Sequence, residues 1–334
     1  MKKLIILSEQ KSFIKKPASS DCIIGQEKAF FRRGEGNVEI LYKSLILKNI
    51  SRVIKKIGFE PICDSFTRKH HDNAVFMYIA MNLVYLKSNR YLLKELKKNG
   101  NKLSLYVYDC WEPEFDAWQK VFDELKPDYI FFCFKQTWEH FKGRYNCYWV
   151  PQSADLDFFQ DLGIEKTRMF IQMGRVNPQM HEAIKSYLNK KGIPDTDDNY
   201  VYRRKEKTDL FPKLPDLVRE INRSRYIVCV PKCYENFKRT GNVSGITARY
   251  FESIACKTMI IGKKPVSFDE LFSSDGMIEF KEDLSDFDDL IQDLENHKEK
   301  YEEIVNKNYE CLMKNHTWGN RLDQIMEIVN SDTK

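Results

Sequence analysis

Long apolar segments are missing from this sequence of 334 residues. A helix that crosses a bilayer needs about 20 consecutive apolar residues, whereas the first ten residues, MKKLIILSEQ, contain a run of only four. We therefore expect a strand and not a signal peptide at this end. The composition argues against a membrane-spanning protein. It favours a cytoplasmic one, attached at most peripherally to the inner face of the cytoplasmic membrane.

Cysteine pairs with metal-binding or redox spacing are also missing. The nine cysteines are scattered and form no Cys-x-x-Cys motif, and only Cys229 and Cys233 lie close together. We interpret them as reduced thiols of an intracellular compartment. The adjacent His70 and His71 are typical of surface residues, so the sequence predicts neither a metal ion nor another cofactor.

Charge is unevenly distributed along the chain. Residues 1–150 carry 26 Lys and Arg against 17 Asp and Glu, whereas residues 151–334 carry 28 against 32. A basic half can hold an anionic acceptor or meet an anionic membrane surface, and a solvated lysine-rich surface explains it equally well. Because the basic residues are not interleaved with aromatic ones in a binding motif, nucleic acid is not an expected partner.

What is present points to a site in residues 244–262, SGITARYFESIACKTMIIG. Ser244, Gly245 and Thr247 suit the start of a helix, and the apolar residues after them have helical spacing. Short apolar runs on both sides, YIVCVP and TMII, indicate buried strands. Strand, glycine-containing loop, helix and strand form a βαβ unit, whose helix N-terminus attracts a phosphate through its backbone N–H groups.

This segment resembles the donor-binding motif of group-1 glycosyltransferases of the GT-B fold, especially the spore-maturation-protein-like (CgeB-type) branch. The resemblance implies that the loop and the helix N-terminus hold the pyrophosphate of a nucleotide sugar. It also implies that Glu252 binds the ribose hydroxyls and that Arg175 contacts the phosphates, and Arg249 of the same helix joins this set. Three further segments resemble the family's linker, first donor-domain strand and closing helix: WVPQSADLDFF, MGR and HTWGNRLDQI.

Three positions depart from the family pattern. The second Glu of the retaining members falls on Ser244, which leaves the stereochemical outcome open. The family's Gly after the Ala-Cys pair is Lys257, so either a lysine adopts a positive φ there or the helix ends differently. The usual phosphate-binding Lys is Met180, for which the cations of residues 203–205 (Arg, Arg, Lys) are candidate substitutes and a solvated turn is the alternative.

Strands and helices alternate along the chain, which predicts an α/β protein. The resemblance implies a GT-B fold with two Rossmann-like domains that face each other across a cleft. We expect an acceptor-binding domain in residues 1–150 and a nucleotide-sugar-binding domain in residues 151–317. A last helix, in residues 318–334, crosses back to the first domain in GT-B proteins.

The first hundred residues give weaker signals. Residues 8–36 form a polar segment without a period, which we interpret as a mobile loop that docks on an anionic acceptor or membrane face. Its cations include Lys11, Lys15, Lys16, Arg32 and Arg33. Helices are expected at 38–57 and 74–96, and a strand at 59–63. The GEGN sequence of residues 34–37 has N–H groups that would suit an anion, although a plain loop is the simpler interpretation.

Two carboxylates are candidates for the base that deprotonates the acceptor. Asp109 ends an alternating strand and Glu112 follows in the next loop, and a carboxylate at a strand end can accept a proton from a sugar hydroxyl. For each, a helix cap or a surface acid is the alternative. Two Asp-x-Asp sequences, at 155–157 and 195–197, have the spacing of a metal site, but we interpret them as loop acids.

These observations predict a glycosyltransferase that moves a sugar from a nucleotide-sugar donor to a glycan or lipid-linked acceptor in surface polysaccharide or glycoconjugate biosynthesis. We expect it to need no metal. A sugar-nucleotide epimerase of similar fold is one alternative, but it requires a catalytic His and acids that the sequence does not place. A non-catalytic carbohydrate-binding or surface-coat protein is the other, and it would hydrolyse no nucleotide sugar.

Overall fold

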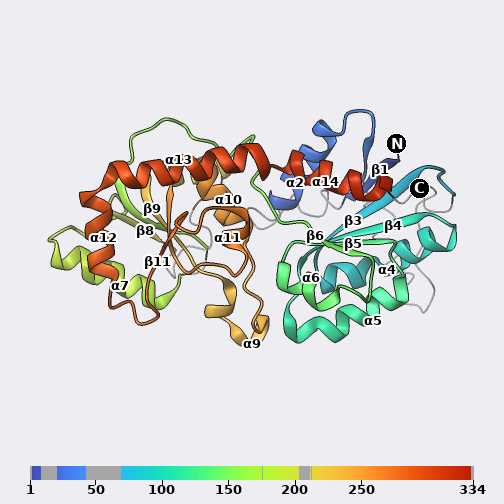
Figure 1. Ribbon diagram of the computed structural model, residues 1–334, viewed down its shortest axis with the longest axis horizontal. Helices are drawn as coiled ribbons and strands as arrows, with labels where there is room; N and C mark the ends of the chain where they lie inside the picture. Colours follow the sequence, from blue (N-terminus) through green and yellow to red (C-terminus); the bar gives the residue numbers. More distant parts are fainter. Residues whose placement is uncertain are drawn as a thin grey trace. The chain divides into compact units, whose positions relative to one another are not determined.

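The structure is a computed structural model, which describes residues 2–8, 21–42, 69–174, 176–202, 211 and 213–331 (Figure 1). By its internal contacts the chain divides into two compact units. The first comprises Met1–Pro151, Lys238–Val243 and Trp318–Lys334, and the second comprises Gln152–Phe237 and Ser244–Thr317. The first division falls after Pro151, and the sequence placed it after Val150. Each unit is built on its own parallel sheet and is described by itself.

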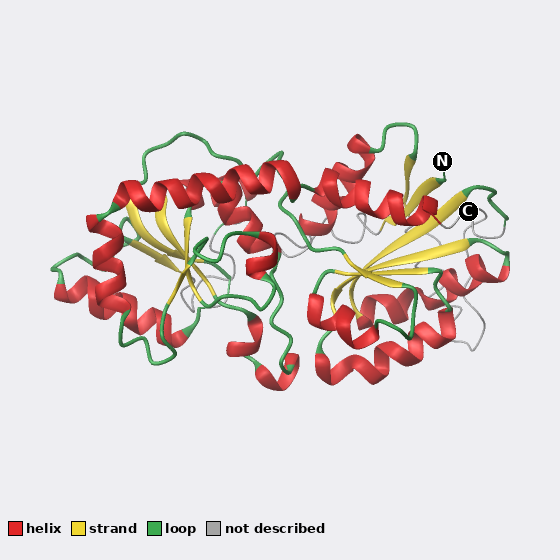
Figure 2. Cartoon of the chain, viewed as in Figure 1, coloured by secondary structure: helices red, strands yellow, loops and turns green. Residues whose placement is uncertain are grey.

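The first unit contains a six-stranded sheet in the order β2-β1-β3-β4-β5-β6, with all neighbours parallel (Figure 2). Its strands are β1 (Lys3–Ser8), β2 (Val38–Tyr42), β3 (Ala74–Asn82), β4 (Lys102–Asp109), β5 (Tyr129–Phe132) and β6 (Cys147–Trp149). The strand order reverses between β1 and β3. In parallel sheets, ligands bind beyond the carboxyl ends of the strands at such a reversal.

Successive side chains of a strand point to opposite faces of the sheet. The strands of this sheet are apolar on both faces, and helices cover both. Leu4 and Ile6 of β1 belong to one hydrophobic cluster, and Ile5 and Leu7 belong to the other. The first cluster is completed by α2 (Asp21–Arg33) and α14 (Trp318–Ser331). The second is completed by α4 (Leu83–Lys98), α5 (Phe115–Leu125) and α6 (Lys135–Phe141).

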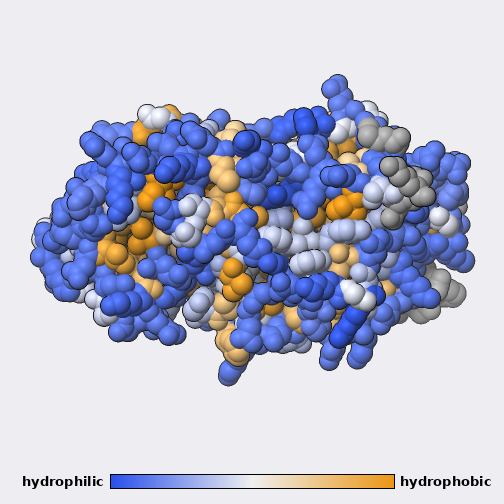
Figure 3. All heavy atoms as spheres, viewed as in Figure 1, coloured by the Kyte–Doolittle hydropathy of each residue, from blue (hydrophilic) through white to orange (hydrophobic). Residues whose placement is uncertain are grey.

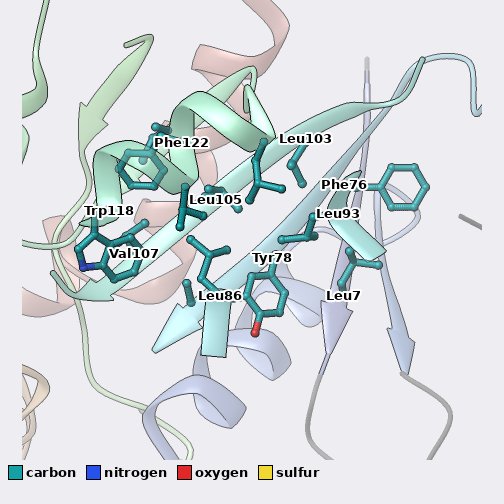
Figure 4. Close-up of a cluster of buried hydrophobic side chains, with 14 of the residues drawn as sticks. Leu7, Phe76, Tyr78, Leu86, Leu93, Leu103, Leu105, Val107, Trp118 and Phe122 are labelled. Carbon is teal, nitrogen blue, oxygen red and sulfur yellow. The ribbon is translucent and has the colours of Figure 1, made fainter. Parts of the chain in front are cut away.

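Figure 4 shows the second of these clusters. Leu105 and Val107 project from β4 toward α5, which contributes Trp118 and Phe122. Both rings are fully buried, and removing a side chain of this size from water stabilises a fold by about 3 kcal/mol. The core of the first unit therefore rests on the two-sided burial of β4 and its neighbours.

The prediction of helix throughout residues 74–96 was wrong for its first part, because Ala74–Asn82 is strand β3. Seven of its nine residues are buried, and a strand covered on both faces has a continuous apolar pattern that periodicity does not separate from a buried helix. The change to helix occurs at Asn82, the N-cap of α4. Its side-chain oxygen accepts hydrogen bonds from the N–H groups of Val84 (3.0 Å) and Tyr85 (3.2 Å).

Two further expectations near the start of the chain were wrong. Residues 21–33, expected to be a loop, form α2, whose buried Ile23 and Phe30 lie seven residues apart on the face that meets the core. Residues 38–42, expected to begin a helix, form β2 and pair with β1, so pairing with a neighbouring strand overrides the local pattern. The expected strand at 59–63 and residues 43–57 of the expected helix lie outside the described residues.

This result also changes the interpretation of residues 8–36 as a docking loop. Arg33 lies in the last turn of α2 and pairs with Asp323 of α14, with its Nη2 2.8 Å from the carboxylate. It is therefore not on a free loop, whereas Lys11, Lys15 and Lys16 lie outside the described residues. In the GEGN turn, the N–H groups of Asn37 and Val38 donate to the carbonyl of Gly34, so these two groups already have partners.

The second unit contains a five-stranded parallel sheet in the order β11-β10-β9-β7-β8. Its strands are β7 (Arg168–Gln172), β8 (Tyr200–Tyr202), β9 (Ser224–Cys229), β10 (Met259–Gly262) and β11 (Ile278–Glu279). Its helices are α7 (Pro178–Lys190), α8 (Leu214–Asn222), α10 (Ala248–Ala255), α11 (Phe268–Leu271), α12 (Phe287–Asn296) and α13 (Lys298–Asn315). Two short helical turns precede α10 in the chain, namely η3 (Lys232–Tyr234) and α9 (Phe237–Thr240), and all of α9 but Phe237 belongs to the first unit. The predicted strands YIVCVP and TMII and the helix between them are confirmed as β9, β10 and α10, with ends shifted by a few residues.

The core of the second unit lies between the sheet and three helices. Phe170 of β7 packs with residues of α7, α12 and α13 in one buried cluster, and its ring meets those of Tyr187 and Phe287 edge-on or tilted at 6.3 Å. The start of α7 is fixed by Pro178 in its first turn and by Asn177, whose side chain accepts from the N–H of Met180 (3.0 Å).

Lys257, which replaces the glycine of the family pattern, adopts a left-handed φ of 48° directly after α10. This confirms the first possibility, that a lysine adopts a positive φ at the turn. A non-glycine residue in this conformation costs roughly 1 kcal/mol. The side chain is held by an ion pair with Asp161 (3.3 Å) and lies over the ring of Tyr309, 4.7 Å from its centroid, and these contacts offset the cost.

The surface is predominantly polar. On the face shown in Figure 3, hydrophilic residues dominate and hydrophobic ones form only small groups. Among the described helices, none combines the length and the apolar character needed to cross a membrane.

Candidate functional site

The carboxyl edge of the second sheet is the place where the fold predicts a ligand. The strand order of this sheet reverses between β7 and β9, which makes the loops after these two strands the walls of a binding crevice. Met173 and Gly174 follow β7, and the segment that leads into α10 follows β9. Residues 244–252 of the predicted donor motif therefore belong to the loop and helix at the reversal.

Arg249 connects the two sides of this reversal. Its guanidinium Nη1 donates a hydrogen bond to the carbonyl oxygen of Met173. Gly174 has a φ of +72°, and a Cβ atom built there would lie 3.1 Å from that same nitrogen. Among the described residues, the Nε atom of Arg249 is buried without a hydrogen-bond partner, and no carboxylate of that part of the chain forms an ion pair with this guanidinium.

The N-terminus of α10 already has one partner. The side-chain oxygen of Gln152 accepts a hydrogen bond from the N–H of Ala248 (2.8 Å), the first residue of the helix. Gln152 is 4% exposed and lies in the segment that the resemblance treated as a linker. The side chain of Gln152 thus satisfies one of the N–H groups predicted to bind an anion. No pattern in the sequence assigned this role to Gln152.

The remaining motif residues surround this helix start. Ser244 and Gly245 are buried, and Thr247 is the N-cap residue without a side-chain capping bond. Glu252 is half-buried on α10, three residues after Arg249, and side chains at this spacing lie on neighbouring positions of a helix face. The structure therefore brings Arg249 and Glu252 to one side of the helix whose start lies at the reversal. Arg175 and residues 203–205 lie outside the described residues.

Close packing at the end of β9 depends on Gly262. This residue has a φ of +137°, and a Cβ atom there would lie 2.2 Å from the carbonyl oxygen of Cys229. The hydroxyl of Tyr250 on α10 donates to the carbonyl of Lys263 (3.0 Å), which fixes the helix against the strand ends. The sequence showed Gly262 only as a strand boundary, because a close backbone approach leaves no signal in a single sequence.

A buried polar chain lies beside β7 and was not predicted. Nδ1 of His181 is 3.0 Å from the hydroxyl of Tyr200, which donates to the side-chain oxygen of Gln172 (2.8 Å). Burial lowers the pKa of His181 and raises that of Tyr200. Gln172 is the last residue of β7, so this chain supports the strand end from which the loop at Gly174 begins.

The two Asp-x-Asp sequences have local partners. The carboxylate of Asp155 accepts from the N–H of Asp157 (3.2 Å), and Asp195 lies 3.7 Å from the amine of Lys185. The backbone carbonyl of Asp197 accepts from Arg168 (2.7 Å). In the described part of the chain no group of His, Cys, Asp and Glu has the arrangement of a metal site.

The first unit has its own polar group at the reversal between β1 and β3. Ser8, the last residue of β1, donates to the carboxylate of Glu27 (2.6 Å), and Tyr108 donates to the side-chain oxygen of Gln26 (2.7 Å). Gln26 and Glu27 are at most 1% exposed. Neither was predicted, because both belong to α2, which the sequence had represented as a loop.

The two candidate bases are placed differently. Asp109 ends β4 and is half-buried, and it lies in register with Asn82 of β3. Glu112 is exposed in the turn η2 (Glu112–Glu114), where its carboxylate oxygen Oε2 accepts from the backbone N–H (2.5 Å) and the side-chain amide (3.1 Å) of Asn242. Asp109 therefore lies at the strand end that the sequence predicted, whereas Glu112 is engaged in a contact with the backbone.

Comparison with known proteins is consistent with this arrangement. Residues 179–327 match the model of a family described as glycosyl transferase-like. No curated protein matches the sequence. Among solved structures, HepE of Anabaena, determined in complex with UDP-glucose, aligns with a TM-score of 0.59 and 10% identity over 99% of this chain and 100% of HepE.

Two other structures align over most of the chain. The N-terminal domain of trehalose-6-phosphate phosphatase from Candida albicans has a TM-score of 0.59 and 10% identity, with 98% of each chain covered. Accessory secretory protein 1, 2 and 3 of Streptococcus pneumoniae gives 0.54 and 13% identity over 87% of this chain and 58% of the other. At such identities the likeness establishes the fold and not the activity. The protein thus has a two-sheet α/β fold of the GT-B type and carries, in residues 179–327, a match to the glycosyl transferase-like family.

Proposed function

We propose that the protein is a glycosyltransferase that takes a sugar from a nucleotide-sugar donor bound by the second unit. The observation that supports this most is the guanidinium of Arg249, held beside the start of α10 at the strand reversal of the unit that contains most of the family match. A cation and a helix N-terminus together attract a diphosphate. The same pair would stabilise the diphosphate as it leaves the sugar, where negative charge develops.

The proposed donor contacts follow the motif. Arg249, Arg175 and the loop with Ser244, Gly245 and Thr247 would face the diphosphate. Glu252 would accept hydrogen bonds from the ribose hydroxyls, since a carboxylate binds two neighbouring hydroxyls well. No metal ion has a role in this scheme, because fixed cationic groups take its place.

A uridine diphosphate sugar is the first donor to test. HepE, which shares the fold, was solved with UDP-glucose, and UDP-glucose is therefore the natural probe for the second unit. We expect the loops after β9 and β10 to determine which sugar of that class is bound, because such loops differ between proteins of one fold.

We place the acceptor on the first unit, at the carboxyl edge of its sheet. Asp109 is the proposed base, because a half-buried carboxylate at a strand end can take a proton from a sugar hydroxyl. A glycan or lipid-linked acceptor of surface polysaccharide biosynthesis fits the basic excess of residues 1–150, and attachment to an anionic membrane face fits it too. We propose the CgeB-type branch of the family on the resemblance of residues 244–262 to its donor motif.

Calorimetry and product release test the proposal together. We expect UDP-glucose or another uridine diphosphate sugar to bind the full chain and to raise its melting temperature by mass action. Slow hydrolysis of the donor, with release of UDP, would distinguish a transferase from a carbohydrate-binding protein of this fold. If no nucleotide sugar from a panel with uridine, guanosine and adenosine bases raises the melting temperature, the proposal fails.

A further inference from the structure

A short piece of the second half of the chain belongs to the first unit. Residues Lys238–Val243 are part of the first unit, although the residues on either side, Phe237 and Ser244, belong to the second. Ser244 begins the predicted donor loop. The piece is therefore joined directly to that loop by the peptide bond between Val243 and Ser244.

Glu112 holds the piece near its C-terminal end, at Asn242. Its Oε2 accepts two hydrogen bonds from Asn242, one from the backbone N–H at 2.5 Å and one from the side-chain amide at 3.1 Å. Charge-assisted hydrogen bonds of this kind are about twice as strong as neutral ones. The backbone of Asn242 is thus tied to a fixed point at the end of the turn that follows β4.

Gly241 leaves room for the side chain of Glu112 in this contact. It has a φ of +59°, and a Cβ atom there would lie 2.2 Å from Oε2 and 2.7 Å from Cβ of Glu112. Any other residue would push the carboxylate away and would also adopt the left-handed region unfavourably. The sequence Gly-Asn therefore supplies both the room for the carboxylate and the two donors that it accepts.

Two further contacts fix the same peptide. The side-chain amide of Gln136 donates to the carbonyl oxygen of Asn242 (2.9 Å), so both backbone polar groups of this residue are bound. Val243 is 3% exposed and packs in the hydrophobic cluster of the first unit that contains Trp111 and Phe134. The residue immediately before the donor loop is therefore anchored by polar and apolar contacts.

We propose that Glu112 is a positioning residue that fixes the backbone at Asn242 and thereby sets the entry of the donor loop at Ser244, Gly245 and Thr247. This inference rests on the proposed function of that loop. It assigns Glu112 a role other than that of a base, because one of its two carboxylate oxygens, Oε2, already accepts two hydrogen bonds that hold the group against Asn242. Asp109 then remains the base candidate in this part of the first unit.

Amide hydrogen exchange and donor binding test the inference on the full chain. Glu112→Ala removes both hydrogen bonds, and we expect exchange at residues 242–247 to become at least about tenfold faster, as loss of a charge-assisted bond predicts. Glu112→Gln retains an acceptor oxygen, so we expect it to restore most of the protection. Asp116→Ala removes an exposed acid of the same region and serves as the matched control.

The affinity for UDP-glucose distinguishes the possible roles. With Glu112→Ala we expect weaker binding, and with Glu112→Gln binding close to that of the wild type. The inference is overturned if exchange at 242–247 in Glu112→Ala equals that in Asp116→Ala. It is also overturned if both Glu112 variants lose turnover while the loop stays protected, because Glu112 would then act chemically. If the loop loosens in Glu112→Ala but the wild type binds no nucleotide sugar, the positioning contact stands and the proposed function fails.

Discussion

The guanidinium of Arg249 donates to the carbonyl oxygen of Met173 across the point at which the strand order of the second sheet reverses. A helix that follows one strand thereby fixes the loop that follows another. The charge of Arg249 remains without a carboxylate partner in the described residues. An arginine without an ion-pair partner among the described residues, beside a helix N-terminus, supports the proposal that an anion binds here.

Arg249→Ala should lower the affinity for UDP-glucose by about 10- to 100-fold, because a charge-assisted contact with the diphosphate is lost. Arg249→Lys keeps the charge but not the planar donor group, so we expect an intermediate affinity. Calorimetry measures both. Arg219→Ala, which removes an exposed arginine of α8, is the control, and equal affinities in the Ala variants would remove Arg249 from the site.

Glu252→Gln should also weaken donor binding, and Glu252→Ala should weaken it further, while the fold remains intact. Hydrogen bonds from ribose hydroxyls to a charged acceptor contribute roughly 1.5–3 kcal/mol. The comparison of UDP with a 2′,3′-dideoxy analogue isolates this contact, since the analogue should bind the wild type and Glu252→Ala alike. Glu302→Gln, on the exposed face of α13, is the control. Undiminished binding of UDP to Glu252→Ala would refute the assignment.

Turnover should survive chelation. If Arg249 and the start of α10 stabilise the leaving diphosphate, a divalent ion is not required. Donor hydrolysis measured with and without EDTA should agree within about twofold, a margin well below the effect of losing one electrostatic group. Loss of activity in EDTA that manganese or magnesium restores would instead assign a role to the acids at 155–157 or 195–197.

The second unit was predicted well because its signals are local. The apolar runs of β9 and β10 are short and bounded, and the helix between them starts after small residues and ends at Ala255, before Lys257. In the first unit the strands β1 and β4 were predicted, whereas β2, β3 and α2 were missed for a physical reason. In β3 both faces are buried, and in β2 the partner strand β1 decides the conformation, so neither is visible in a window of ten residues. Close contacts such as those of Gly241 with Glu112 join residues more than 100 positions apart and leave no trace in a single sequence.

Gly262→Ala should destabilise the protein by more than about 2 kcal/mol, since strain and overpacking act at the same position. The new Cβ would lie 2.2 Å from the carbonyl oxygen of Cys229, which is backbone and cannot rotate away. Gly192→Ala is the matched control, because Gly192 also has a positive φ (+65°) but no atom near the added Cβ. Thermal unfolding should show a clearly larger loss for Gly262→Ala. Equal losses would mean that the backbone conformation alone matters.

Lys166 provides a prediction about pH. Its amine donates to the carbonyl of Asn222 (3.1 Å) and to the hydroxyl of Thr258 (3.1 Å), and burial lowers its pKa from 10.5 to about 8. The folded chain thus releases this proton at a lower pH than the unfolded chain does. Between about pH 8 and pH 10.5 the unfolded state binds more protons, so the contribution of Lys166 to stability rises with pH in this window.

Lys166→Met removes this titration while preserving the apolar stem. The buried thiol of Cys256, whose pKa burial raises to about 12, has the opposite effect above pH 9. It is present in both proteins, but the charge of Lys166 lowers the pKa of this thiol, so the comparison is cleanest below pH 9. The stability of the wild type relative to Lys166→Met should therefore increase between pH 7.5 and pH 9.5, by at most about 1.4 kcal/mol per pH unit. Urea unfolding at several pH values measures the difference. A flat or falling difference would mean that the amine of Lys166 stays protonated among its oxygen partners in the folded protein.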